Sequence, residues 1–139
     1  SEMEEYDESQ ADPDATSEKD IPPGAVVFEV QGPFFFGAVN RFQEMVFGAL
    51  KRCKPELIVL RLRHVPVIDA TGLNVISDFA RQCHKRHLPL VLSGVQEQPF
   101  REFKKYGVTA EVGEANVCRD IDSAIARVNE ILKVGKIEQ

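Results

Sequence analysis

The segment 65–73 constrains the fold of this chain most, because an apolar run stops there at an aspartate and an amphipathic helical pattern begins at once. A buried strand that hands over to a helix in this way leaves the first helical turn open to a ligand or partner. Asp69 is predicted to cap the helix by accepting the backbone N–H of Thr71 or Gly72, and a helix capped only for stability has the same sequence. Gly72 also has no side chain to block a close approach. The candidate binding residues are Asp69, Ala70, Thr71 and Gly72.

Strands and helices alternate along the rest of the chain. Apolar residues form short runs in the predicted strands and recur at three-to-four spacing in the predicted helices. Strands are expected at residues 25–30, 57–62, 88–92 and 111–112, and helices at residues 39–50, 70–87, 99–106 and 121–132, the last capped by Asp120. The resulting β-α-β-α-β-α-β-α order predicts an α/β fold with a mixed or mainly parallel central sheet covered by about four helices.

Charge divides the chain into an acidic start and a mildly basic remainder. Residues 1–20 hold nine acidic side chains and one basic one, so they carry −8, and the other residues carry +3 within the net charge of −5. A segment with so few apolar residues cannot bury enough surface to offset its ordering entropy. We expect residues 1–22 to form a disordered acidic tail or linker, residues 23–135 to form one domain, and residues 136–139 to form a C-terminal tail.

Three consecutive aromatic residues, Phe34, Phe35 and Phe36, follow the first predicted strand. Neighbouring side chains on a strand or tight loop face different ways, so the three cannot all point into one core. They form either an apolar plug beneath the loop or a contact surface for a membrane domain or another partner.

No arrangement in the chain is typical of catalysis or of a metal site. The three cysteines are widely spaced, which indicates a reducing, cytoplasmic compartment. Cys83 and His87 fall on one helical face, but no second cluster completes a tetrahedral zinc site. Cys83 is therefore expected to pack in the core, with His84 and His87 at the end of a helix. Because nucleophile arrangements, a Walker-type loop and paired carboxylates are also missing, we expect no catalytic residue, no metal and no cofactor.

The loop 31–38, the strand 57–62 and the turn 68–73 together resemble the STAS domain over residues 22–134. This family is shared by anti-anti-sigma factors and by the cytoplasmic ends of SulP-type anion transporters. The Gly-Pro-Phe-Phe-Phe loop favours the transporter branch. No apolar run approaches the roughly 20 residues needed to cross a bilayer, so any membrane part would lie outside this chain.

The resemblance implies a non-catalytic regulatory or structural domain in a transporter of sulfate or a related anion. Such a domain lies at the cytoplasmic face of the inner (plasma) membrane and meets the membrane domain of its own transporter. It implies, in addition, weak binding of a nucleotide or anion at the Asp69 turn. Asp69 itself opposes an anion there, because its carboxylate already occupies the positive end of the helix.

Two signalling proteins remain as alternatives. A free anti-anti-sigma-like regulator would be phosphorylated on a serine directly after the aspartate, where this chain has Ala70, and only Thr71 offers a hydroxyl nearby. Thr71 is better suited to support the start of the helix. A response-regulator receiver needs an acidic pair after its first strand to hold Mg²⁺, and here that strand offers only Glu29.

A group of basic residues forms the last candidate surface. Its members are Arg81, Lys85, Arg86, Arg101, Lys104 and Lys105. The negative charge of an anionic lipid surface, or of an acidic protein such as acyl carrier protein, would attract these side chains. An ordinary solvated helix face would have the same composition. Nucleic acid is not expected as a partner, because a charge of only +3 and an acidic tail weaken phosphate binding.

Overall fold

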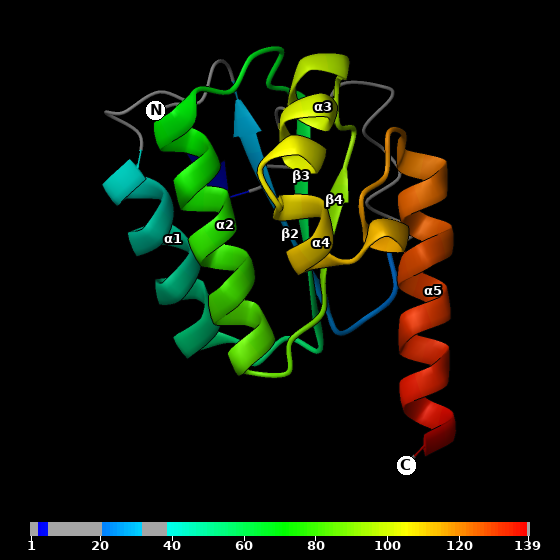
Figure 1. The fold of residues 1–139 in the computed structure, drawn as a ribbon. Helices are drawn as coiled ribbons and strands as arrows, with labels where there is room; N and C mark the ends of the chain where they lie inside the picture. The colour runs from blue at the N-terminus through cyan, green and yellow to red at the C-terminus, as the bar shows by residue number, and fades with distance from the viewer. Residues whose placement is uncertain (1–2, 6–20, 32–38, 139) are drawn as a thin grey trace.

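The computed structural model describes residues 3–5, 21–31 and 39–138 (Figure 1). Within these ranges the chain forms both strands and helices. The strands are β1 (Met3–Glu5), β2 (Ala25–Gln31), β3 (Leu57–His64) and β4 (Leu90–Ser93). The helices are α1 (Val39–Arg52), α2 (Ala70–Lys85), α3 (Glu97–Lys105), α4 (Val108–Val112), the 3-10 helix η4 (Glu114–Asn116) and α5 (Ile121–Glu138).

The strands form one mixed sheet in the order β1-β2-β3-β4. β2, β3 and β4 are parallel, and β1 runs antiparallel to β2 at the edge. Val27, Val59 and Val91 lie side by side in register across the three parallel strands. An isolated parallel bridge from Leu92 to Val117 extends the pairing beyond β4. The predicted α/β fold with a mixed or mainly parallel sheet is confirmed.

β3 is buried on both faces of the sheet. Every residue from Leu57 to Leu62 is buried, and burial on both faces explains why Leu57 to Leu60 form a continuous apolar run and not an alternating one. Successive side chains point to opposite faces. Ile58 and Leu60 therefore contribute to the larger apolar core, whereas Leu57 and Val59 contribute to a smaller one.

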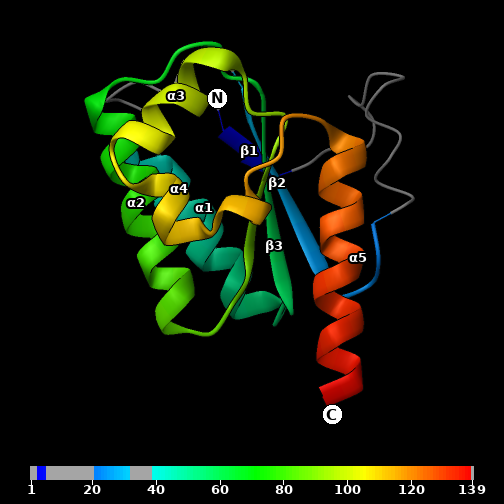
Figure 2. The ribbon, with the colours of Figure 1, turned by 45° about the vertical axis from the view of Figure 1, so that its right-hand side comes forward.

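The helices cover the two faces unequally. α1 to α4 lie on one side of the sheet, and α5 lies alone on the other (Figure 1, Figure 2). Phe79 of α2 and Phe103 of α3 are buried in the larger core, and full burial of such a side chain stabilises by about 1.5–3 kcal/mol. α5 packs through Ala124, Val128 and Leu132, the apolar stripe that its sequence predicts.

α2 ends at Lys85 in a Schellman motif, close to the predicted boundary at His87. The N–H of Leu88 donates to the carbonyl oxygen of Cys83 at 2.9 Å, and the N–H of His87 donates to that of His84 at 3.1 Å. His87 adopts a left-handed φ of 55°, which costs a residue other than glycine roughly 1 to 2 kcal/mol. The motif reverses the chain and fixes where β4 begins.

The predicted strand at Glu111 and Val112 is wrong, because both residues lie in α4. Gly107 (φ 88°) and Gly113 (φ 102°) bracket this helix with positive φ angles that favour glycine. A five-residue helix between two such turns is too short to display a helical period. The strand-like pairing occurs instead at the isolated bridge beyond η4.

Both ends of the chain differ from the predicted domain boundaries. The sequence places Met3–Glu5 in a disordered tail, whereas these residues pair with β2 and satisfy part of its open edge. Residues 1–2 and 6–20 lie outside the described part of the chain, so the prediction for them is not tested. At the other end, α5 continues to Glu138, through positions predicted as a C-terminal tail, because extending an existing helix costs little.

Gly94 is predicted to tolerate substitution poorly. Its φ is 67°, and a Cβ built there would lie 2.8 Å from the Cβ of Arg63 on β3. Gly94→Ala should therefore lose about 1 to 2 kcal/mol to the left-handed backbone and about 1 to 3 kcal/mol more to overlap. Gly107→Ala is the matched control, because φ is 88° there and no heavy atom lies within 4 Å. Urea unfolding of both variants measures the difference, and equal losses would contradict the steric argument.

Candidate functional site

Asp69 caps α2 as the sequence predicts. Its backbone is extended (φ −96°, ψ 179°), and its carboxylate Oδ1 accepts the N–H of Gly72 at 2.8 Å. The carbonyl oxygen of Asp69 accepts the N–H of Leu73 at 2.9 Å. Ala70 is exposed and Thr71 half-buried, and no described group accepts the N–H of either residue. Two backbone donors therefore face outward beside a carboxylate.

Two glutamines at the start of α3 hold the loop between β3 and α2 in place. The side chain of Gln98 both donates to and accepts from the backbone of Ile68, at 3.1 Å and 2.9 Å. Gln96 Nε2 donates to the carbonyl oxygen of Arg63 at 2.7 Å. The sequence analysis missed both residues, because each partner is 30 or more positions away in the chain. They give the turn a fixed shape before any partner arrives.

Two apolar residues of this loop, Pro66 and Val67, are exposed beside the start of α2. Val65 and Ile68 are buried, but Pro66 is exposed and Val67 has 48% of its surface exposed. Val67 and Tyr106 are the exposed large apolar side chains among the described residues. Exposed apolar side chains next to the outward N–H groups of Ala70 and Thr71 are suited to contact with a protein surface.

A buried charged row lies at the same end of the sheet, on the face that α5 covers. Glu29, Arg61 and Ser93 are neighbours in register on β2, β3 and β4, and all three are buried. Arg63 Nε donates to Glu29 Oε1 at 2.8 Å, and His64 Nε2 lies 3.5 Å from the same oxygen. Glu29 is therefore engaged in structural pairing, which disfavours the receiver-type role of binding Mg²⁺.

Residues 16–124 match the family model described as the STAS domain. The chain is a member of the STAS domain family. None of the described helices is long and apolar enough to cross a lipid bilayer.

Two solved STAS-like structures are similar in sequence as well as fold. A sulfate transporter family protein from Wolinella succinogenes is 38% identical, with a TM-score of 0.77, over 88% of this chain and 99% of that one. The SulP transporter STAS domain from Vibrio cholerae is 32% identical, with a TM-score of 0.68, over 81% and 88%. The predicted resemblance to the SulP branch is confirmed.

Two more distant relatives define the wider family. YvdB of Bacillus subtilis (strain 168), whose name assigns it provisionally to sulfate transport, is 22% identical over 66% of this chain, which spans only 17% of YvdB. An anti-sigma factor antagonist from Thermotoga maritima, also named provisionally, has a TM-score of 0.68 at 20% identity, over 78% of this chain and 91% of that one. The latter likeness extends to the fold alone.

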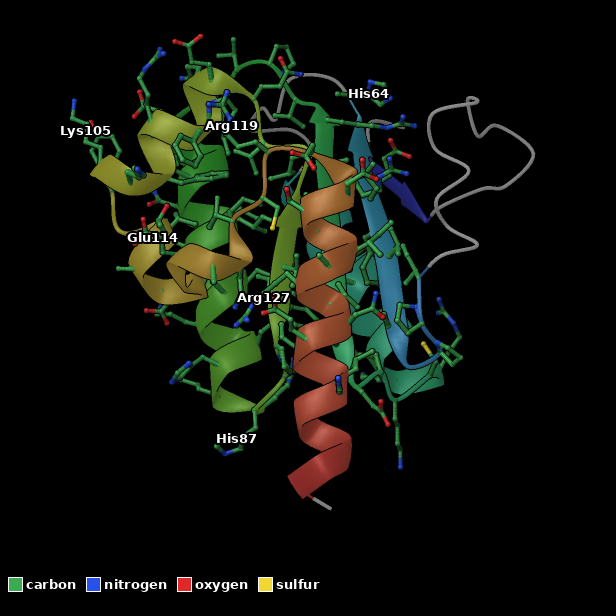
Figure 3. All side chains as sticks on the ribbon, turned by 90° about the vertical axis from the view of Figure 1, so that its right-hand side faces the viewer. His64, His87, Lys105, Glu114, Arg119 and Arg127 are labelled. Carbon is green, nitrogen blue, oxygen red and sulfur yellow. The ribbon has the colours of Figure 1, made fainter. Side chains whose placement is uncertain are left out.

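Two predicted sites remain, the three consecutive phenylalanines and the group of basic residues. Phe34, Phe35 and Phe36 lie outside the described residues, so their role stays a prediction. The basic residues fall into two groups, on α2 and on α3, and α4 packs against both helices. Figure 3 shows Lys105 at the side of the domain, well away from His87 near the end of α2.

Most of the basic side chains have local partners. Arg101 pairs with Glu97 at 3.0 Å and Arg81 with Asp78 at 3.5 Å. Three more cations lie over aromatic rings, at the following distances to the ring centroid: Lys104 over Phe100 (4.7 Å), Lys105 over Tyr106 (5.3 Å) and Arg86 over Phe47 (5.1 Å). Exposed pairs of this kind contribute little to stability. Whether the two groups act together on one partner stays a prediction.

Cys83 and Cys118 are buried, whereas Cys53 is exposed. Cys83 packs in the larger core as predicted, and burial raises the pKa of its thiol to about 12, although Arg86 opposes the shift. Burial likewise raises the pKa of the Cys118 thiol. No three His, Cys, Asp or Glu side chains converge within the part of the chain that the structure describes.

The hydrogen bond from Gly72 makes the contribution of Asp69 testable. Asp69→Ala should lower the free energy of unfolding by about 1 kcal/mol, because it leaves the Gly72 N–H without its acceptor. Asp69→Asn keeps an oxygen acceptor and should lose only a few tenths of that amount. Asp78→Ala is the control, since it removes an exposed carboxylate from the same helix. Urea unfolding compares the three variants, and a wild-type value for Asp69→Ala would exclude the cap as a source of stability.

Proposed function

We propose that this chain is the non-catalytic regulatory STAS domain of a SulP-type transporter for sulfate or a related anion. The observation that carries the proposal is the 38% identity with a sulfate transporter family protein, which extends over nearly the whole of that chain. The ion would pass through the membrane part of the transporter. This domain would lie at the cytoplasmic face of that membrane part. The domain itself would act by contact, as a support or a sensor.

The Asp69 turn is the surface that we assign to this contact. Its loop is clamped by Gln98, and a preformed loop loses little conformational entropy when it binds. Val67 would enter an apolar pocket of the membrane domain, while the outward N–H groups of Ala70 and Thr71 would meet carbonyl oxygens of the partner. Phe34, Phe35 and Phe36 would add to the same contact if they lie exposed.

Other ligands of this domain would bind more weakly. A nucleotide or inorganic anion at the turn faces the carboxylate of Asp69, and the positive end of an exposed helix contributes only about 0.3 to 1 kcal/mol. The basic residues of α2 and α3 would attract anionic lipid or an acidic protein such as acyl carrier protein, in a manner that salt weakens.

A free anti-anti-sigma-like regulator is the second candidate, supported by the shared fold. Ala70 stands where that branch carries a phosphorylatable serine, and its exposed position would make a hydroxyl there accessible. Because alanine has none, the usual switching reaction could not occur at this position. The position therefore favours the transporter proposal.

Sulfate uptake by the transporter that contains this domain tests the proposal. Val67→Glu places a charge in the proposed contact and should lower the initial uptake rate by about fivefold or more, at unchanged amounts of protein in the membrane. Asn129→Glu is the matched control, because it adds the same charge at an exposed position on α5. Both isolated variants should unfold as the wild type does.

Two outcomes would contradict different parts of the proposal. Wild-type uptake by Val67→Glu would remove the contact from the Asp69 turn and leave the transporter assignment intact. A protein that moves neither sulfate nor any other small anion, and stays in the soluble fraction, would overturn the assignment and favour the free regulator.

A further inference from the structure

A cavity of about 340 Å³ lies between the carboxyl ends of α1 and α2, at the opposite end of α2 from Asp69. These two helix ends lie side by side in Figure 1 and Figure 2. Figure 3 shows the separation of the two sites, with His64 near the Asp69 turn and His87 at the far end of the domain. The cavity is therefore separate from the contact surface proposed above.

The floor of the cavity is apolar and preformed. Phe47, Leu50 and Leu88 line it, and all three are partly buried. The ring of Phe47 packs edge to face on Phe79 in the core, with ring centroids 6.2 Å apart. Leu88 is held by its hydrogen bond in the Schellman motif. These constraints keep the cavity open without a ligand.

The rim of the cavity carries unbalanced positive charge. Lys51, Lys54 and Arg86 line it, and no carboxylate does. Within the described residues, none of these three cations forms an ion pair. Part of this charge complements the negative ends of the two helix dipoles. Three neighbouring cations above an apolar floor nevertheless create a local field that attracts an anion.

Arg86 is positioned to bind that anion directly. Its guanidinium lies over the ring of Phe47, 5.1 Å from the centroid. Because Arg86 forms no ion pair among the described residues, its N–H groups are available for the two parallel hydrogen bonds that a carboxylate, sulfate or phosphate group accepts. The ring contact also limits the rotamers of Arg86, so less entropy is lost on binding.

A second cavity, of about 370 Å³, provides the contrast. It lies on the other side of Leu88, and its lining includes the carboxylate of Glu111 beside His84 and His87. It therefore lacks both the excess of lysine and arginine and the stacked guanidinium. The combination of cationic rim and apolar floor belongs to the first cavity.

We propose that the cavity between α1 and α2 binds an amphiphilic anion, with one carboxylate, sulfate or phosphate group on the rim and an apolar body on the floor. Lys51, Lys54 and Arg86 hold the anionic group, and Phe47, Leu50 and Leu88 bury the apolar part. The proposal goes beyond the transporter assignment and does not depend on it. The ligand arrives either as a free anion or as part of a lipid.

Titration of the isotope-labelled 139-residue chain with octanoate tests the site. Octanoate should shift the amide signals of Leu50, Lys51 and Leu88, and its affinity should fall as salt rises. Two further probes test the two parts of the site separately. 1-Octanol has the apolar body without the charge, and inorganic sulfate has the charge without the apolar body. Either probe binding as tightly as octanoate would overturn the amphiphilic assignment, as would octanoate shifts confined to other regions.

A matched pair of double variants tests the rim. Lys51→Gln/Lys54→Gln should weaken octanoate binding about fivefold to tenfold in calorimetry. Lys133→Gln/Lys136→Gln removes the same charge from α5 and should leave the affinity unchanged. Equal weakening by both variants would show an effect of net charge only and contradict the site. Phosphatidylglycerol vesicles that shift the same amides would identify a lipid source, and a response to octanoate alone would identify a free anion.

Discussion

The burial of β3 on both faces is the constraint on which the rest of the structure depends. A strand of this kind needs parallel neighbours on each side and a layer of helices on each face, and β2, β4, α1 to α4 and α5 supply them. The same two neighbouring strands also border the polar carboxyl end of β3. Arg61 and Arg63 lie near this end of the strand, and beyond His64 the chain turns toward Asp69.

α2 links the two surfaces to which we assign binding. One end is fixed by the carboxylate of Asp69, and its loop is fixed by Gln98. The other end is fixed by the turn at His87 and by the stacking of Arg86 on Phe47. A helix held at both ends and buried along one face moves as a rigid unit. The position of each surface therefore depends on the same packing against the sheet.

The sequence predicted those parts of the structure that rest on local interactions. The caps at Asp69 and Asp120 follow from side chains that accept an N–H three residues further on, and the apolar stripe of α5 follows from its period. The clamp by Gln98 depends on a partner 30 positions away, and nothing local distinguishes this glutamine. The strand predicted at Glu111 was wrong because two glycine turns, and not a hydrophobic period, define that short helix. The charged row around Glu29 depends on strand register, which the sequence does not display.

The position of α5 affects the order in which this domain can be completed. Every strand of the sheet precedes α5 in the chain, and the face that α5 covers has no other described helix. During synthesis on the ribosome, the sheet and its four other helices therefore emerge while Leu57, Val59 and Val91 are still exposed to water. Exposed strand faces of this kind invite association with other chains. Docking of α5 buries these three side chains.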